Sequence, residues 1–173
     1  MKMTSWFKLS VLAVATAASV GAYAGNTGTI TVNGRINSTG CVIDAASTAA
    51  PVEMGTIITG GFTTPGDKST AKDFTIHLTQ CPETQTGVSL TANGTANTTN
   101  TKLLAVNGVT GVGLALYNAD DSQIDLKSPS AVTAIDATSH EATIPLKAAL
   151  VYTGGTVNEG QFTATTNFTL TYN

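Results

Sequence analysis

The last strand-like stretch of the chain reads Asn167-Phe168-Thr169-Leu170-Thr171-Tyr172, and Asn173 alone follows it. Its side chains alternate between polar and apolar, which is typical of a β-strand with one buried face. Successive strand residues point to opposite faces, so Phe168, Leu170 and Tyr172 share the apolar face. A β-sandwich that ends here lacks the strand that would cover this one. We therefore expect an apolar strand left without a neighbour at the edge of a sheet.

The same period-two pattern recurs upstream, with Thr filling the outward face. It is clear over 29–36 and 74–80, more mixed over 143–152, and shorter over 88–91 and 112–117. Thr and the other β-branched residues favour strands. In the clearest internal run, Phe74, Ile76 and Leu78 share one face, and Thr75, His77 and Thr79 share the other. These runs predict an all-β sandwich of about seven strands.

Turn signals separate the strand candidates. Gly60-Gly61, Asn93-Gly94 and Gly154-Gly155 are typical of tight turns. The polar, low-complexity stretch 91–101 is interpreted as a hairpin loop. We expect at most a short helix, within 44–50 or 129–137.

The composition predicts one domain and excludes several functions. The chain has 173 residues, and 42% of them are hydrophobic, which is enough to build a core. Only 11% are charged, and the net charge is −3. Those values exclude a protein that binds nucleic acid through a clustered basic surface, and they argue against a polybasic membrane-surface protein.

Residues 1–24 have the pattern of a secretory signal peptide. Lys2 and Lys8 give a positive start, an apolar run covers 9–20, and Ala22-Tyr23-Ala24 supplies small residues at the cleavage site. The apolar run is shorter than the roughly 20 residues that span a membrane. We expect export and a mature chain of residues 25–173.

Export bears on the chemistry of the only two cysteines in the sequence, Cys41 and Cys81. An oxidising compartment would let them pair as a disulfide. The alternative is half of a metal site, with His77 four residues before Cys81, but no ligand pattern surrounds Cys41. A disulfide that closes a loop of about 40 residues stabilises a domain by roughly 4 kcal/mol in the chain-entropy model.

Catalytic patterns are missing from the sequence. It contains no Gly-x-Ser-x-Gly, Cys-x-x-Cys or His-Glu-x-x-His motif. His77 and His140 are predicted to be solvated surface histidines. Asp120, Asp121 and Asp125 lack the spacing of a calcium loop and are interpreted as a polar turn. We expect a protein that is not an enzyme, with no cofactor, no metal site and no small-molecule substrate.

The segment 25–36 is the second unusual end of the mature chain. It is strand-like and rich in Gly and Thr, with little apolar content of its own. A solitary strand with unpaired backbone groups costs stability. It either folds back to complete its own domain or completes a neighbouring chain by adding a strand to a sheet edge.

These features together resemble chaperone–usher fimbrial subunits, the pilins of Gram-negative bacteria, and look most like the major subunits of type 1-like fimbriae. The similar motifs run along the whole mature chain: Gly28-Thr-Ile30-Thr-Val32-Asn-Gly34, Val52-Glu-Met54-Gly55, Phe74-x-Ile76-x-Leu78-x-x-Cys81, Gly111-Val-Gly-Leu-Ala-Leu-Tyr117, Leu146-Lys-Ala148, Gly160-Gln161-Phe-Thr-Ala164 and Phe168-x-Leu170-x-Tyr172. Each motif is weak alone, and their combination with the signal peptide and the cysteine spacing is specific.

The resemblance implies an incomplete immunoglobulin-like sandwich, the pilin fold, which lacks its last strand and carries an N-terminal donor-strand extension. Residues 1–24 would be the signal peptide, 25–36 the extension and 37–173 the pilin domain. The function implied is that of a structural subunit, which polymerises head to tail by donor-strand exchange into a surface fibre for cell adhesion.

The resemblance also implies roles for individual residues. Gly28, Ile30, Val32 and Gly34 would form the donated strand, with Ile30 and Val32 as its apolar anchors. The acceptor groove and chaperone contact would comprise Phe168, Leu170, Tyr172 and Asn173. Implied partners are other copies or other pilins, a periplasmic chaperone whose basic residues hold the Asn173 carboxylate, and an outer-membrane usher. The subunit would pass through the periplasm to the cell surface.

Two alternatives stay open. One is a minor or adaptor fimbrial subunit, which has the same parts as a major subunit. The other is a secreted β-sandwich carbohydrate-binding module. Such a module needs clustered aromatic side chains, whereas only 6% of the residues of this chain are aromatic.

Overall fold

The fold is seen in a computed structural model that describes residues 40–49 and 51–173. The predicted signal peptide, the extension 25–36 and its residues Gly28, Ile30, Val32 and Gly34 lie outside the described residues. The described elements are β1 (Val42–Ile43), α1 (Ala45–Ala49), the 3-10 helix η1 (Thr59–Gly61), β2 (Lys72–Thr79), β3 (Gly87–Gly94), β4 (Val112–Asn118), β5 (Gln123–Ile124), β6 (Thr133–Ala134), β7 (Ala142–Tyr152) and β8 (Thr166–Tyr172). No helix within this part of the chain is long and apolar enough to cross a membrane.

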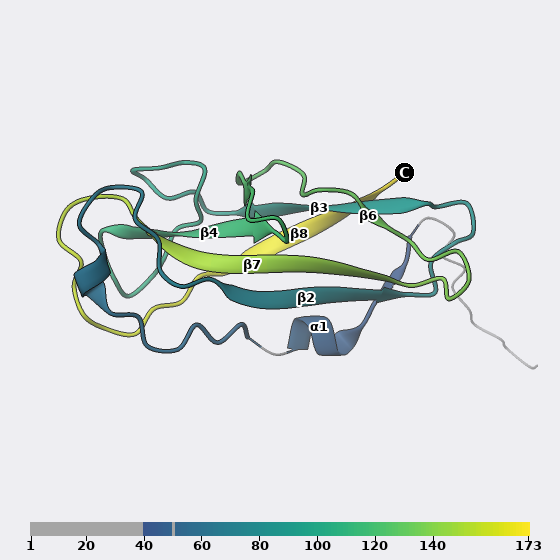
Figure 1. Cartoon of the computed structure of the whole chain (residues 1–173), viewed down its shortest axis with the longest axis horizontal. Helices are drawn as coiled ribbons and strands as arrows, with labels where there is room; N and C mark the ends of the chain where they lie inside the picture. Colours follow the sequence, from purple (N-terminus) through teal and green to yellow (C-terminus); the bar gives the residue numbers. More distant parts are fainter. Residues whose placement is uncertain (1–39, 50) are drawn as a thin grey trace, which may run out of the picture. The chain divides into compact units, whose positions relative to one another are not determined.

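The strands form two antiparallel sheets, as predicted. One sheet has the order β1-β2-β7-β4-β5, and the other has the order β6-β3-β8. Figure 1 shows β2, β7 and β4 in one layer and β3 and β8 in the other. The prediction of an all-β sandwich is confirmed, and residues 40–49 and 51–173 contain eight strands.

The main core lies between the two sheets. Ile76 and Leu78 of β2 are buried there with Val88 and Leu90 of β3, and Phe74 packs half-buried against the same cluster. The strict alternation of β2 therefore places its apolar side chains on the inner face, as the sequence predicts.

A second cluster explains why the pattern of 143–152 is mixed. Ala115 and Tyr117 of β4 and Ala149 and Val151 of β7 are buried together with Leu103, away from the main core cluster. Their neighbours Leu116 and Ala148 belong to the main core. Both faces of these strand ends are covered, so their residues do not alternate between buried and exposed.

One local expectation is corrected, and another is confirmed. The stretch 91–101 is not a hairpin loop throughout, because β3 continues to Gly94 and pairs with β8 along its whole length. A short helix does form within 44–50 as α1, whereas 129–137 contains the strand β6 and no helix.

Candidate functional site

The candidate site is the outer edge of β8. This strand pairs with β3 on one side, with Leu170 opposite Leu90 and Phe168 opposite Ala92. On its other side, no strand of residues 40–49 and 51–173 pairs with it. Within the described part of the chain, β8 is therefore an edge strand.

The backbone of β8 presents hydrogen-bonding groups at this free edge. In β3, Leu90 and Ala92 direct their main-chain groups away from β8: Ser130 N–H donates to Leu90 O, and Lys127 N–H donates to Ala92 O. Residues facing each other in an antiparallel pair either both bond across the pair or both point outward. The main-chain groups of Leu170 and Phe168 consequently point outward, toward the free edge. An unpaired row of this kind is a template for another strand.

The apolar face of β8 is incompletely covered. Val88, Leu90 and Ala92 on the paired strand are 0%, 3% and 1% exposed. Phe168, Leu170 and Tyr172 pack against the same core but are only half-buried. Met54, in the segment between α1 and η1, is likewise half-buried against that core. Apolar surface is thus available beside the free edge.

The predicted disulfide is present and fixes one end of this edge. Cys41 and Cys81 are bonded, with their Cα atoms 4.1 Å apart. Cys41 N–H also donates to the hydroxyl of Tyr172, at 3.1 Å. The first described residues, Gly40 and Cys41, therefore lie at the Tyr172 end of β8.

The structure brings together three of the four residues predicted for the acceptor groove. Phe168, Leu170 and Tyr172 line the inner face of β8, whereas Asn173 is exposed. Asn173 N–H donates to Gly87 O, and its main-chain oxygen accepts from Thr86 N–H, at 2.9 and 2.8 Å. Their role in binding a strand or a chaperone stays a prediction. Gly40 was not among the predicted site residues, because its only signal in the sequence is that it precedes Cys41.

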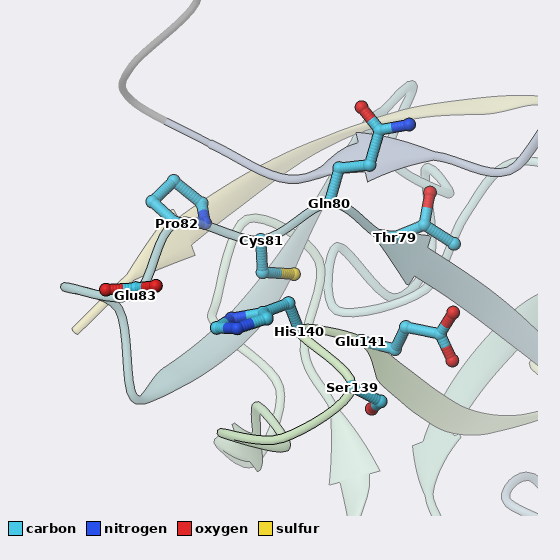
Figure 2. Close-up of a pocket in the computed structure, with 8 residues that line it drawn as sticks. All are labelled: Thr79, Gln80, Cys81, Pro82, Glu83, Ser139, His140 and Glu141. Atoms are coloured by element: carbon cyan, nitrogen blue, oxygen red, sulfur yellow. The ribbon is translucent and has the colours of Figure 1, made fainter.

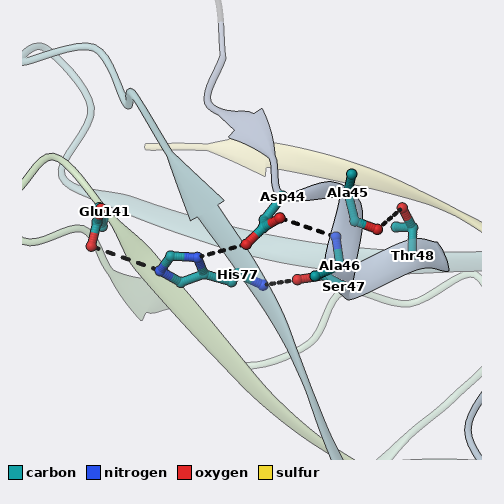
Figure 3. A network of polar contacts seen from close by, with 7 residues as sticks. All are labelled: Asp44, Ala45, Ala46, Ser47, Thr48, His77 and Glu141. Atoms are coloured by element: carbon teal, nitrogen blue, oxygen red, sulfur yellow. Dashed lines mark hydrogen bonds and ion pairs between the residues drawn. The ribbon is translucent and has the colours of Figure 1, made fainter. Parts of the chain in front are cut away.

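His77 is half-buried rather than fully solvated. Its Nδ1 lies 3.6 Å from Asp44 Oδ2, and its Nε2 lies 3.7 Å from Glu141 Oε2 (Figure 3). Its main-chain N–H donates to Ser47 Oγ at 2.9 Å, and Asp44 N–H donates to His77 O at 3.0 Å. These contacts join the segment around α1 to β2. His77 thus has a structural role, because its contacts with Asp44 and Ser47 hold the first part of the described chain against β2.

An open polar hollow lies next to the disulfide. His140, half-buried, faces Cys81 there, and its main-chain oxygen accepts from Cys81 N–H at 2.9 Å (Figure 2). Glu83 and Glu141 supply carboxylates to the rim. In the described part of the chain, no group of three or more His, Cys, Asp or Glu side chains could hold a metal ion.

The acidic residues of the loops accept local hydrogen bonds or form ion pairs with lysines. Ser122 donates its hydroxyl and its N–H to Asp120, and these bonds hold the pKa of that carboxyl below its usual range. Bonds from the N–H groups of Ser139 and Thr138 likewise lower the pKa of Asp136. Asp121 pairs with Lys147, and Asp125 pairs with Lys102 at 2.9 Å. Asp120, Asp121 and Asp125 thus stabilise loops and strands.

Comparisons with known proteins agree with this architecture. Residues 29–173 match the family model described as Fimbrial protein. Long polar fimbria protein A of Salmonella typhimurium is 32% identical over 171 residues, which cover 96% of this chain and 94% of that protein.

Solved structures show a similar fold. The P pilus rod subunit PapA has a TM-score of 0.67 at 23% identity, covering 78% of this chain and all 100% of PapA. A subunit from the structure of a chaperone–usher pilus has a TM-score of 0.66 at 24% identity, covering 86% of this chain and 97% of that one. The edge strand β8, the Cys41–Cys81 disulfide and these structural neighbours agree with the family match. The match over residues 29–173 and the Salmonella relative establish that the chain belongs to the fimbrial protein family.

Proposed function

We propose that this structural subunit polymerises head to tail, with residues 25–36 of one copy lying along the free edge of β8 in the next. One observation carries the proposal: β8 is an edge strand whose apolar face is only half-buried. Members of the fimbrial family assemble with other subunits into a surface fimbrium, and a strand added to β8 would give that assembly a physical basis.

The donated strand has matching chemistry. Its alternating residues would form main-chain hydrogen bonds with the outward-pointing groups of Leu170 and Phe168. Ile30 and Val32 would pack beside Phe168, Leu170 and Tyr172, and burial of each is worth about 1.5–3 kcal/mol. Gly28 and Gly34 would lie where the groove leaves no room for a side chain.

The same edge also supports a proposal about partners that act before assembly. An exposed edge strand with apolar surface is prone to aggregate. We propose that a periplasmic chaperone covers it by donating a strand of its own, with basic residues at the Asn173 carboxylate, and that an outer-membrane usher exchanges the chaperone for the next subunit. The signal peptide 1–24 would direct export through the periplasm. The role is architectural, without catalysis.

Denaturant unfolding of two oxidised proteins tests the proposal. One comprises residues 37–173, and the other has residues 26–36 appended after Asn173 through a flexible linker. We expect the appended strand to yield a monomer and to raise the free energy of unfolding by roughly 3–6 kcal/mol, from burial of Ile30 and Val32 alone. A matched control carries Ile30→Asp and Val32→Asp in the appended copy and should give no gain. Equal stability of all three proteins would refute the proposal.

A further inference from the structure

Tyr172 touches both the free edge of β8 and the point where the N-terminal part of the chain joins the described fold. Its hydroxyl accepts the hydrogen bond from Cys41 N–H, at 3.1 Å, across 131 residues of sequence. A Cβ built on Gly40 would lie 2.9 Å from Cε2 and 3.2 Å from Cζ of the Tyr172 ring. The ring therefore lies directly against the backbone of Gly40, which leaves no room for a side chain there.

The other side of Cys41 is fixed as well. Its disulfide joins it to Cys81, next to the end of β2. The next strand residue, Val42, pairs with Thr79 of β2. Gly40 and Cys41 are consequently held between β2 in one sheet and Tyr172 of β8 in the other. In the sequence, the segment 25–36 ends four residues before Gly40, where these contacts begin.

We propose that Tyr172 is a positioning residue for its own subunit's donor segment and couples filling of the β8 edge to presentation of residues 25–36. This inference rests on the proposed function. A segment whose root is held in one place samples fewer orientations, and such preorganisation favours binding. A strand laid along β8 restrains the Tyr172 ring, and the ring restrains Gly40 and Cys41. Coupling of this kind is reciprocal, so displacing the root also changes the end of the groove.

The test separates donating a strand from accepting one. The donor is the mature chain with a linked copy of residues 26–36 after Asn173, which fills its own β8 edge and leaves its native extension available. The acceptor is the mature chain carrying Ile30→Asp and Val32→Asp in its extension, so that it accepts without donating. Size-exclusion chromatography over time gives the rate at which the two form a heterodimer. Binding of a fluorescent peptide of residues 26–36 to the acceptor gives the accepting activity.

Two variants disturb the contact from opposite sides. Tyr172→Phe removes the hydroxyl and keeps the ring. Gly40→Ala adds a methyl group against the ring, and its backbone lies outside the left-handed region, so alanine adds no backbone strain there. Tyr152→Phe is the matched control, because the Tyr152 hydroxyl donates to Gly155 O at 2.7 Å and contacts neither site.

Placed in the donor, Tyr172→Phe should slow heterodimer formation about fivefold, the factor expected for one hydrogen bond between uncharged groups. Gly40→Ala should slow it as well, and Tyr152→Phe should leave it unchanged. Placed in the acceptor, Gly40→Ala should weaken peptide binding as well, because the coupling is reciprocal and Gly40 is not itself a groove residue. An unchanged rate of donation in Tyr172→Phe, or an acceptor affinity that Gly40→Ala leaves unchanged, would overturn the inference.

Amide hydrogen exchange gives a second measurement. If Tyr172 only stabilised the fold, peptide binding would not change the exchange rate at the Cys41 N–H. Exchange at the Cys41 N–H should slow when the peptide binds the wild-type acceptor, and it should be fast and insensitive to peptide in Tyr172→Phe. The Asp44 N–H, bonded to His77 O at 3.0 Å, is the internal control and should be the same in both proteins. An exchange rate at the Cys41 N–H that does not change when the peptide binds the wild-type acceptor would contradict the coupling. If the wild-type acceptor binds no peptide at all, the proposed function itself fails, which is a distinct result.

Discussion

The hydroxyl of Ser130 accepts a hydrogen bond from Leu90 N–H at 2.9 Å, and Ser130 N–H donates to Leu90 O at 2.7 Å. On the side of β3 away from β8, the buried Ser130 thus pairs with both main-chain groups of Leu90, in place of a neighbouring strand. Ser130→Ala would leave a buried N–H unpaired, which costs about 1–3 kcal/mol. Urea denaturation measures the loss. Ser128→Ala, at a half-buried position two residues earlier, is the control, and an equal loss in both variants would contradict the assigned role.

Leu170→Ala should weaken binding of a peptide of residues 26–36. Leu170 lies in the middle of the half-buried face of β8, and loss of its contacts with a partner strand is worth about 1.5–3 kcal/mol, or roughly tenfold to a hundredfold in affinity. Fluorescence titration measures this change. Thr171→Ala, at the adjacent exposed position, should bind normally. Indistinguishable affinities of the two variants would place the binding surface elsewhere.

Replacing both cysteines, Cys41→Ala with Cys81→Ala, should lower the free energy of unfolding by about 4 kcal/mol, because the unfolded chain gains the freedom of a loop closed over 40 residues. Denaturant unfolding of the oxidised wild type and of the variant checks this value. Adding a reductant should destabilise the wild type and leave the variant unaffected. A loss below 1 kcal/mol would show that the disulfide adds little to the packing.

Acid should destabilise the domain through its loop carboxylates. Hydrogen bonds from Thr64 and Thr63 lower the pKa of Asp67, and those from Ser139 and Thr138 lower that of Asp136. A carboxyl whose pKa is lower folded than unfolded stabilises fully above the unfolded value, near 3.9, and this contribution disappears as pH falls through the folded value. Stability from these groups should therefore be constant above about pH 5 and fall below about pH 4.

Urea unfolding midpoints between pH 7 and pH 2 measure that profile. Asp67→Asn should be less stable than the wild type at pH 7, and the gap should close toward pH 2. Glu159→Gln, at an exposed position, should follow the wild-type curve. A gap that stays constant across the whole range would rule out the protonation of Asp67 as its cause.

The sequence predicts strands best where one face meets the core and the other meets solvent. β2 and β8 have this arrangement, and their alternation placed Ile76, Leu78, Phe168 and Leu170 correctly on inner faces. β4 and the end of β7 are covered on both faces, with Leu103 packed on the outer one, so their pattern is mixed. Thr91–Gly94 resembles a loop in composition and is a strand because β8 pairs with it. Pairing over that distance overrides local propensity.

The same limit applies to the candidate site. Alternation alone brings Phe168, Leu170 and Tyr172 to one face, and export predicts the bond between Cys41 and Cys81. The contact of Gly40 with Tyr172 joins segments from opposite ends of the chain and depends on how the two sheets stack. No local pattern carries that information. The extension 25–36 lies outside the described residues, so its role stays a prediction.

The Cys41–Cys81 disulfide has a mechanical consequence for a fibre under tension. A pull on residues 25–36 enters the folded domain at Gly40 and Cys41, where the covalent bond passes the load to Cys81, next to the end of β2. The two-residue ladder between β1 and β2 is bypassed, although its few hydrogen bonds would otherwise break first. The load then spreads through β2 into the longer β7, to which seven residue pairs connect it. The short strand β1 is thereby shielded from the force.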